Sequence, residues 1–248
     1  MIYLKNNSEI EKLYCAGQIV KETLLMIEEY IVPGVTTMDL DKKAEEFIIS
    51  QNSKPGFKGL YNYPATLCTS IDDEVVHGIP SDKRILKEGQ IISIDVGSIY
   101  DGYYGDHAKT FCVGKVDKEK MKLLDITKKC LYKGISEVKI GNSIGDIGFA
   151  IQTFAEANGF SVVKDLVGHG IGQKLHEEPQ VPNYGEKGTG PLIQEGLCLA
   201  IEPMINIGAD DVVTKEDNWT VCTKDGKSSA HFEHSIALTE NGVKILTE

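Results

Sequence analysis

Residues 91–113 read IISIDVGSIYDGYYGDHAKTFCV, two apolar runs joined by the dipeptide Asp101-Gly102. An Asp-Gly pair between such runs predicts a two-residue hairpin turn. We therefore expect antiparallel strands over 91–100 and 103–113, with the tyrosines on either side of the turn paired. Because strand side chains alternate between faces, this hairpin also fixes which way each residue of the stretch points.

Two carboxylates of the hairpin are expected to converge on one point. In the predicted register Asp95 pairs with Ala108, so Asp106 lies diagonally across from Asp95 on the same face. A carboxylate in an apolar strand is costly unless it is paired or bound to a metal. A pair of solvated hairpin acids is the alternative, and the apolar run around Asp95 favours a metal site.

Three further residues complete a set of metal ligands. Glu202 lies in LAIEPMI, Glu233 in HFEHSIAL and His169 in VGHGIG. Four carboxylates with one imidazole suit two divalent ions of manganese, iron, cobalt or zinc. Taken alone, a histidine such as His169 is more often a packed or capping residue. The glycines around it lack the G-x-G-x-x-G spacing, which argues against a dinucleotide site.

Helical periodicity and capping signals predict four helices. A capping-box pattern at Ser8 and Glu11 marks the start of the first, and Thr36 or Thr37 can cap the second. The later two start near Asp117 and Ser143. The expected helices cover residues 8–31, 36–52, 117–138 and 143–159.

The order helix, helix, strands occurs twice, and short matches recur at one constant offset. That offset is 107 residues, as from Gly34 to Gly141. The matched positions are Gly34 with Gly141, Asp39 with Asp146, Phe47 with Phe154, Glu88-Gly89 with Glu195-Gly196, and Asp95 with Glu202. Because the last pair equates two proposed ligands, we expect a pseudo-symmetric fold with the metals between its halves.

Composition argues against several classes of protein. The chain has 248 residues and a formal net charge of −11, which disfavours nucleic acid as a partner because such binding relies on clustered cations. The six cysteines are scattered without a C-x-x-C pair. No apolar run approaches the ~18 residues of a membrane span. We expect a cytoplasmic protein without membrane or nucleic-acid contacts, and by default a monomer.

Five ordered motifs carry a resemblance to a known family. They are HGIP at 77–80, DVGSIYDGYYGD at 95–106, GHGIG with HEEP within 168–179, IEPM at 201–204 and FEHS at 232–235. On these motifs the chain resembles the type I methionine aminopeptidases of the pita-bread metallopeptidase fold. The resemblance implies an α+β fold, a pseudo-twofold repeat of two helices and strands around a curved antiparallel sheet. It implies one catalytic domain over 1–248, with halves at about 1–115 and 116–248.

The resemblance also implies a reaction and a role for each ligand. The enzyme would remove the N-terminal methionine from nascent proteins and peptides with a small second residue. Asp106 and Glu233 would bridge two metal ions, and Asp95 would chelate one of them. His169 and Glu202 would complete the coordination of the other. A metal-bridging hydroxide would attack the first peptide bond, with Glu202 as the proton shuttle.

Several histidines receive different expectations. By resemblance, His176 would donate a hydrogen bond to the substrate carbonyl and His77 would contact the scissile amide, whereas the alternative for each is a surface imidazole. His231 and His234 flank a proposed ligand and are expected to point away from the metals. Strand alternation also turns His107 off the metal face, so we expect no change in metal affinity for His107→Ala.

The resemblance assigns the substrate pocket to Tyr63, Cys68 and Trp219. Aromatic and sulfur groups suit the thioether of methionine, although the only tryptophan could equally fill a core. The chain departs from the family at three positions: Leu175 for a phenylalanine, Leu60 for an aromatic residue and Gln173 for an arginine. A wider pocket that tolerates norleucine or leucine is the expected result.

Two other interpretations share this fold. An X-Pro aminopeptidase or prolidase keeps the five ligands but usually carries a large extra N-terminal domain. A metal-free binding module usually loses ligands, and all five are present here. The short interval from His169 to Glu202 favours type I over type II enzymes. The family implies peptide and nascent-protein N-termini as partners, with transient association with the ribosome.

Overall fold

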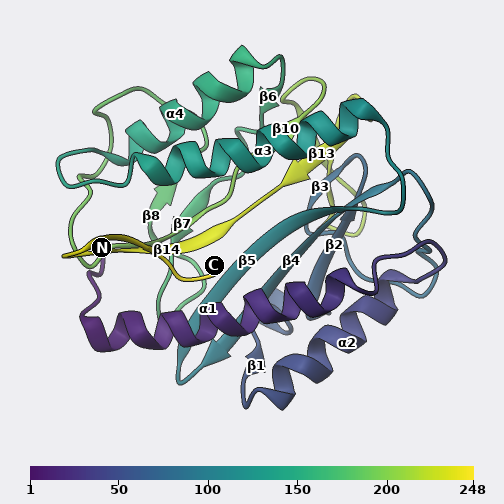
Figure 1. Cartoon of the computed structure of the whole chain (residues 1–248), viewed down its shortest axis with the longest axis horizontal. Coiled ribbons are helices and arrows are strands. Elements are labelled where there is room, and N and C mark those ends of the chain that lie inside the picture. The colour runs from purple at the N-terminus through teal and green to yellow at the C-terminus, as the bar shows by residue number, and fades with distance from the viewer.

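Two pairs of helices cover opposite sides of a set of curved antiparallel strands (Figure 1). The computed structural model describes residues 1–248. Its helices are α1 (Asn7–Glu28), α2 (Thr37–Ser50), α3 (Lys118–Ser136) and α4 (Ile144–Ala157), with a short 3₁₀ turn η1 (Leu60–Asn62). The first pair lies along strands β4 and β5, and the second pair lies on the far side of β14 (Figure 1).

The strands form four antiparallel sheets, each of which gathers segments from distant parts of the chain. The first contains β1 (Lys54–Pro55), β2 (Leu67–Ile71), β4 (Ile91–Tyr100) and β5 (Tyr103–Cys112). The second contains β6 (Ser161–Val162), β10 (Met204–Asn206) and β13 (Ser229–His231). The third contains β3 (Glu74–Val76), β11 (Val212–Thr214) and β12 (Val221–Thr223). The fourth has the order β15 (Gly242–Ile245), β14 (His234–Thr239), β9 (Cys198–Ile201), β7 (Gly168–Gly170), β8 (Glu177–Val181).

The hairpin expected from residues 91–113 is present in the predicted register. Tyr100 pairs with Tyr103 across the turn, and Asp95 pairs with Ala108. Asp101 and Gly102 both have positive φ, of 46° and 81°, as a type I′ turn requires. The two aspartates of the hairpin therefore share one face, and the long strand pair extends through the centre of the fold.

The first helix begins two residues earlier than the sequence indicated. Asn6 is its N-cap, with the Asn6 side chain accepting from the Glu9 N–H and the Glu9 carboxylate accepting from the Asn6 N–H. Ser8 and Glu11 do not form the box. Glu9 also accepts from the Tyr103 hydroxyl at 2.8 Å, so a contact with β5 selects the first of two overlapping capping patterns. The caps expected at Thr36 and Ser143 are confirmed.

The repeat found in the sequence also appears in the hydrogen bonding. Two isolated bridges, Thr36 with Ile85 and Ser143 with Leu192, occupy positions related by the same offset. The bond from the Leu86 N–H to the Val35 carbonyl has its counterpart between Ile193 and Asn142, at 2.8 and 2.9 Å. Each half thus joins the start of its second helix to the segment that leads into its central strand.

Each half has its own hydrophobic core. One core packs α1 and α2 against β2, β4 and β5, with Leu40, Ile48 and Ile94 fully buried. The other packs α3 and α4 against β9 and β14, with Leu123 and Ile147 fully buried. A third cluster lies between them and contains the apolar residues that surround the site described below. No helix has both the length and the apolar composition that crossing a membrane would require.

A buried carboxylate connects the second helix to the first sheet. Asp41 of α2 is 5% exposed and accepts from the backbone N–H groups of Thr66 and Leu67 at 2.9 and 2.8 Å. We predict that Asp41→Ala lowers the free energy of unfolding by about 2–4 kcal/mol, because two buried donors lose their acceptor. Asp41→Asn keeps a carbonyl acceptor and should lose less in urea unfolding. Equal losses for the two variants would contradict this account.

Candidate active site

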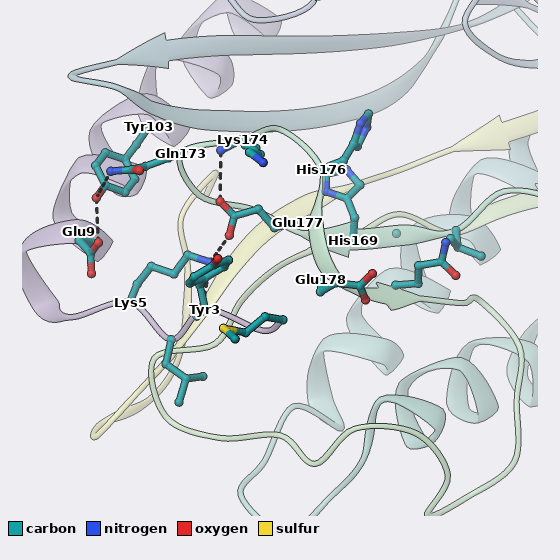
Figure 2. Close-up of a pocket in the computed structure, with 15 residues that line it drawn as sticks. Tyr3, Lys5, Glu9, Tyr103, His169, Gln173, Lys174, His176, Glu177 and Glu178 are labelled. Carbon is teal, nitrogen blue, oxygen red and sulfur yellow. Dashed lines mark hydrogen bonds and ion pairs between the residues drawn. The ribbon is translucent and has the colours of Figure 1, made fainter. Parts of the chain in front are cut away.

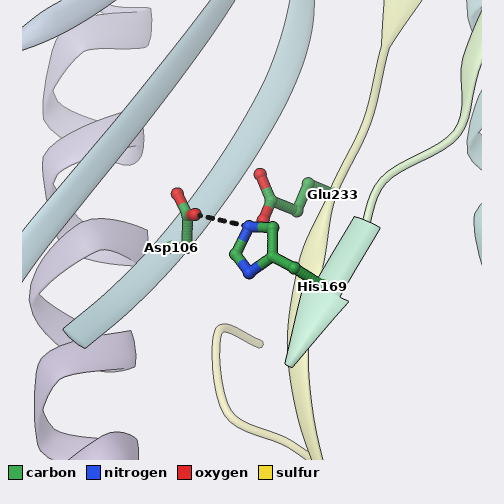
Figure 3. Close-up of side chains that lie close together, drawn as sticks. All are labelled: Asp106, His169 and Glu233. Carbon is green, nitrogen blue, oxygen red and sulfur yellow. Dashed lines mark ion pairs between the residues drawn. The ribbon is translucent and has the colours of Figure 1, made fainter. Parts of the chain in front are cut away.

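Three of the proposed ligands meet at the centre of the fold. Asp106 comes from β5, His169 from β7, and Glu233 from the link between β13 and β14. Their ligand atoms lie within 4.8 Å of one another (Figure 3). His169 Nε2 is 3.6 Å from Asp106 Oδ2, and its Nδ1–H donates to the Gly170 carbonyl at 2.9 Å. That second bond leaves Nε2 as the free ligand nitrogen, facing the carboxylates.

The other two proposed ligands join the same group. Asp95 lies on β4 beside Asp106, and Glu202 follows β9 directly. The Glu202 carboxylate is 3.5 Å from His169 Nε2. Each central sheet therefore contributes ligands, two aspartates from the β4–β5 hairpin and the others from the sheet that contains β7, β9 and β14.

The buried negative charge of these carboxylates favours a bound cation. Burial, followed by the charge of Asp106, raises the pKa of Asp95 well above its usual range, and the same two causes raise the pKa of Glu233. One oxygen each of Asp95, Asp106 and Glu233 is buried without a hydrogen-bond donor. Unpaired buried carboxylate oxygens are strongly unfavourable. These residues therefore fit bound divalent metal, with oxygen donors and one nitrogen.

The five ligands line one small cavity together with every residue that the sequence assigned to the substrate. Its volume is about 80 Å³. The expected lining residues are Tyr63, Cys68, His77, Asp95, Asp106, His169, His176, Glu202, Trp219 and Glu233. Leu60 and Leu175 also line it. The cavity thus places an apolar and aromatic wall opposite a group of carboxylates, which suits a ligand with one apolar and one polar end.

A larger cavity of about 790 Å³ adjoins the first and shares His169 and His176 with it. Its wall includes the buried ion pair of Lys5 with Glu177, at 2.7 Å (Figure 2). Gln173 belongs to this second cavity, where its amide donates to the Tyr103 hydroxyl at 3.2 Å. The replacement of an arginine by Gln173 therefore lies outside the lining of the small cavity.

The expectation for His231 was wrong. Its Nε2 lies 3.5 Å from Glu202 Oε2, and the residue is 1% exposed. His231 and Glu233 are two residues apart, so the alternation of an extended chain places them on the same side. His234 does point away, with its Nδ1 2.8 Å from the Thr247 hydroxyl oxygen.

Two aromatic residues of the cavity had no signal in the sequence. Tyr61 adopts a positive φ of 49° in the η1 turn and stacks on His176 with ring centres 6.0 Å apart. Phe57 lines the cavity and belongs to the cluster between the two cores. Neither residue falls in a motif, and their positions follow from the irregular segment before β2.

Comparisons with known proteins agree with this geometry. Residues 11–240 match the profile of Metallopeptidase family M24. The methionine aminopeptidase of Clostridium acetobutylicum is 51% identical over 247 residues, which cover 100% of this chain and 99% of that protein. Methionine aminopeptidase 1 of Bacillus subtilis is 49% identical, with the same coverage.

Solved structures show the same relationship. The methionine aminopeptidase of Thermotoga maritima has a TM-score of 0.98 and 46% identity, with full coverage of both chains. The prolidase of Pyrococcus furiosus has a TM-score of 0.78 at 23% identity and is covered to 65% of its length, so it supports the fold alone.

The pita-bread fold and the carboxylate-rich centre define a metal-dependent peptidase. The chain belongs to metallopeptidase family M24 and, within it, to the methionine aminopeptidases.

His107 contacts the backbone of Glu233, one of the proposed metal ligands. The residue lies off the metal face as expected, but its Nδ1–H donates to the Glu233 carbonyl and its ring stacks on His234 at 4.7 Å. We therefore revise the expectation for His107→Ala and predict about tenfold weaker Mn(II) binding, because a group that orients a ligand typically contributes 10–100-fold. Isothermal titration of the metal-stripped protein measures it. His107→Gln keeps an N–H donor and should lose less, whereas unchanged affinity in His107→Ala would restore the first expectation.

Proposed function

We propose that this protein removes the N-terminal methionine from peptides and nascent proteins whose second residue is small. The observation that carries the proposal is the single cavity in which buried, donorless carboxylate oxygens face Tyr63, Cys68 and Trp219. A methionine side chain fits the aromatic and sulfur wall. The free amine and first peptide bond would then lie beside the carboxylates, which restricts the reaction to the first residue.

Asp95, Asp106, His169, Glu202 and Glu233 would hold two divalent ions, of manganese, iron, cobalt or zinc. When bound, such ions acidify a water molecule and polarise the carbonyl that it attacks. Within this chain, Glu202 would take and return the proton; its carboxylate lies 3.5 Å from both His169 Nε2 and His231 Nε2.

Two further histidines line the cavity and would bind the scissile peptide. His176 packs edge-on against His169 at 4.5 Å, and His77 packs edge-on against Trp219 at 6.3 Å. In these positions His176 would donate to the carbonyl oxygen as charge develops on it. His77 would contact the amide nitrogen. Tyr63, whose hydroxyl donates to the Leu67 carbonyl at 2.9 Å, would hold the pocket wall rigid.

The proposal also covers the setting of the reaction. Residues 1–248 would act as one catalytic domain, a cytoplasmic monomer that acts on peptide and nascent-chain N-termini during transient association with the ribosome. Membrane and nucleic-acid partners are not part of it, in keeping with the formal net charge of −11.

The reaction is expected to depend on bound divalent metal and on Glu202. The metal-stripped protein should release no methionine from Met-Ala-Ser and should recover activity with Mn(II), Fe(II), Co(II) or Zn(II). Glu202→Gln should lower kcat by about 100-fold or more, the usual contribution of a proton-transfer group. Glu22→Gln, on the exposed face of α1, is the matched control. Cleavage only of Ala-Pro-Ala would indicate a prolidase, and inactivity with every metal would indicate a binding module.

The width of the pocket is expected to set which side chains are accepted at the first position. Leu175 is 5% exposed and packs in the cluster with Tyr63 and Cys68. We expect the wild type to accept norleucine and leucine at the first position, and Leu175→Phe to raise the preference for methionine over leucine by about tenfold, a typical effect of pocket size. Kinetics with Met-Ala-Ser, Nle-Ala-Ser and Leu-Ala-Ser measure it. Leu192→Phe, at a 60% exposed position, controls for the substitution itself. A wild type that already rejects leucine completely would contradict the prediction.

A further inference from the structure

The wall of the cavity opposite the ligands depends on the tip of one hairpin. Trp219, the only tryptophan of the chain, lies in the connection between β11 and β12. Its ring packs edge-on against Tyr63, with centres 4.9 Å apart and planes at 73°, and lies near His77. Residues 215–218 of the hairpin tip are exposed, so few packing contacts hold this segment and its own hydrogen bonds help to fix the direction of the indole.

An exposed carboxylate holds that conformation. Asp217 Oδ1 accepts from the backbone N–H groups of Trp219 and Thr220 at 2.9 and 2.8 Å. Asp217 Oδ2 accepts from the Thr220 hydroxyl at 2.6 Å. The loop closes through the Lys215 N–H, which donates to the Thr220 carbonyl at 2.8 Å. Aspartate stabilises turns by accepting bonds of this kind from the backbone just beyond it. Asp217 thus reaches the cavity only through Trp219.

The base of the hairpin is tied to the strands that carry the rest of the pocket. Glu74 of β3 is 6% exposed and accepts from Lys215 Nζ and from the Ile71 N–H, each at 2.8 Å. It also forms an ion pair with Arg84. Ile71 ends the strand that contains Cys68, so one buried carboxylate connects the hairpin to the strand that carries another residue of the same wall.

We propose that Asp217 is a positioning residue for methionine selectivity, which sets the indole of Trp219 against the substrate side chain. The inference rests on the proposed function for its substrate. The contact lies on the side chain of the first residue, remote from the reacting bond. Such a contact is made equally in the ground state and the transition state, so its loss raises KM and leaves kcat nearly unchanged.

The test compares three variants with the wild-type, metal-loaded enzyme. We expect Asp217→Ala to raise KM for Met-Ala-Ser by about fivefold to tenfold. This factor corresponds to the free energy that is typically lost when a side-chain oxygen that accepts from backbone N–H groups is removed. The preference for Met-Ala-Ser over Leu-Ala-Ser should fall with it. Asp217→Asn keeps an oxygen acceptor for both N–H groups, so its KM and its preference for Met-Ala-Ser should be close to those of the wild type.

The control is a second exposed aspartate with the same chemistry at the far end of β12. Asp225 accepts from the N–H groups of Ala209 and Lys227 at 2.9 and 3.0 Å, and it does not line the cavity. Asp225→Ala should leave KM and selectivity as in the wild type. Equal kinetic losses in Asp217→Ala and Asp225→Ala would overturn the proposal, because they would reflect a general loss of stability.

A readout independent of turnover comes from the single tryptophan. Acrylamide quenching of its fluorescence reports only Trp219, and we expect stronger quenching in Asp217→Ala than in the wild type or Asp217→Asn. Unchanged quenching together with unchanged KM would overturn the proposal. If the wild type released no methionine with any metal, the proposed function and the selectivity role would both fail, whereas the quenching comparison would still decide whether Asp217 holds Trp219.

Discussion

The rest of the structure depends on the mutual repulsion of four carboxylates that are held together in a largely buried site. No Lys or Arg side chain pairs with them, and the only side-chain nitrogen atoms within ion-pair distance are the Nε2 atoms of His169 and His231. A protein tolerates such a group only if bound cations compensate the charge and the scaffold prevents the carboxylates from separating. The two halves meet this requirement because each has its own packed core and presents its proposed ligands on central strands or directly beside them.

The internal repeat explains how one chain builds both sides of the site. Equivalent bridges join Thr36 to Ile85 and Ser143 to Leu192. The segment before each central strand is therefore held in the same way to the start of a helix. Asp95 and Glu202 then occupy corresponding places on β4 and directly after β9. The two halves differ in the segments that follow these matched positions. The first half continues as a long regular hairpin that places Asp106, whereas the second half inserts the β10–β13 region, with Trp219, before Glu233.

The parts that sequence alone predicted are those governed by local rules. The Asp101-Gly102 turn determines the register of β4 with β5, and that register determines the convergence of Asp95 and Asp106. Helix starts were also predictable, except where two capping patterns overlap and the contact of Glu9 with Tyr103 selects between them. The failures concern irregular segments and the side to which a residue beside a strand points, as for His231 near Glu202. Tyr61 depends on an irregular turn.

The proposed chemistry and the proposed choice of substrate depend on different parts of the structure. The proposed ligands lie on strands of the central sheets or directly beside them, between two packed cores, so a change at one carboxylate affects its neighbours through buried charge. Trp219, by contrast, lies on an exposed hairpin whose conformation depends on hydrogen bonds to Asp217 and an ion pair with Glu74. Substitutions on that hairpin can alter the pocket without disturbing the carboxylates. Such a division would allow the first-residue preference to change while the buried carboxylates remain in place.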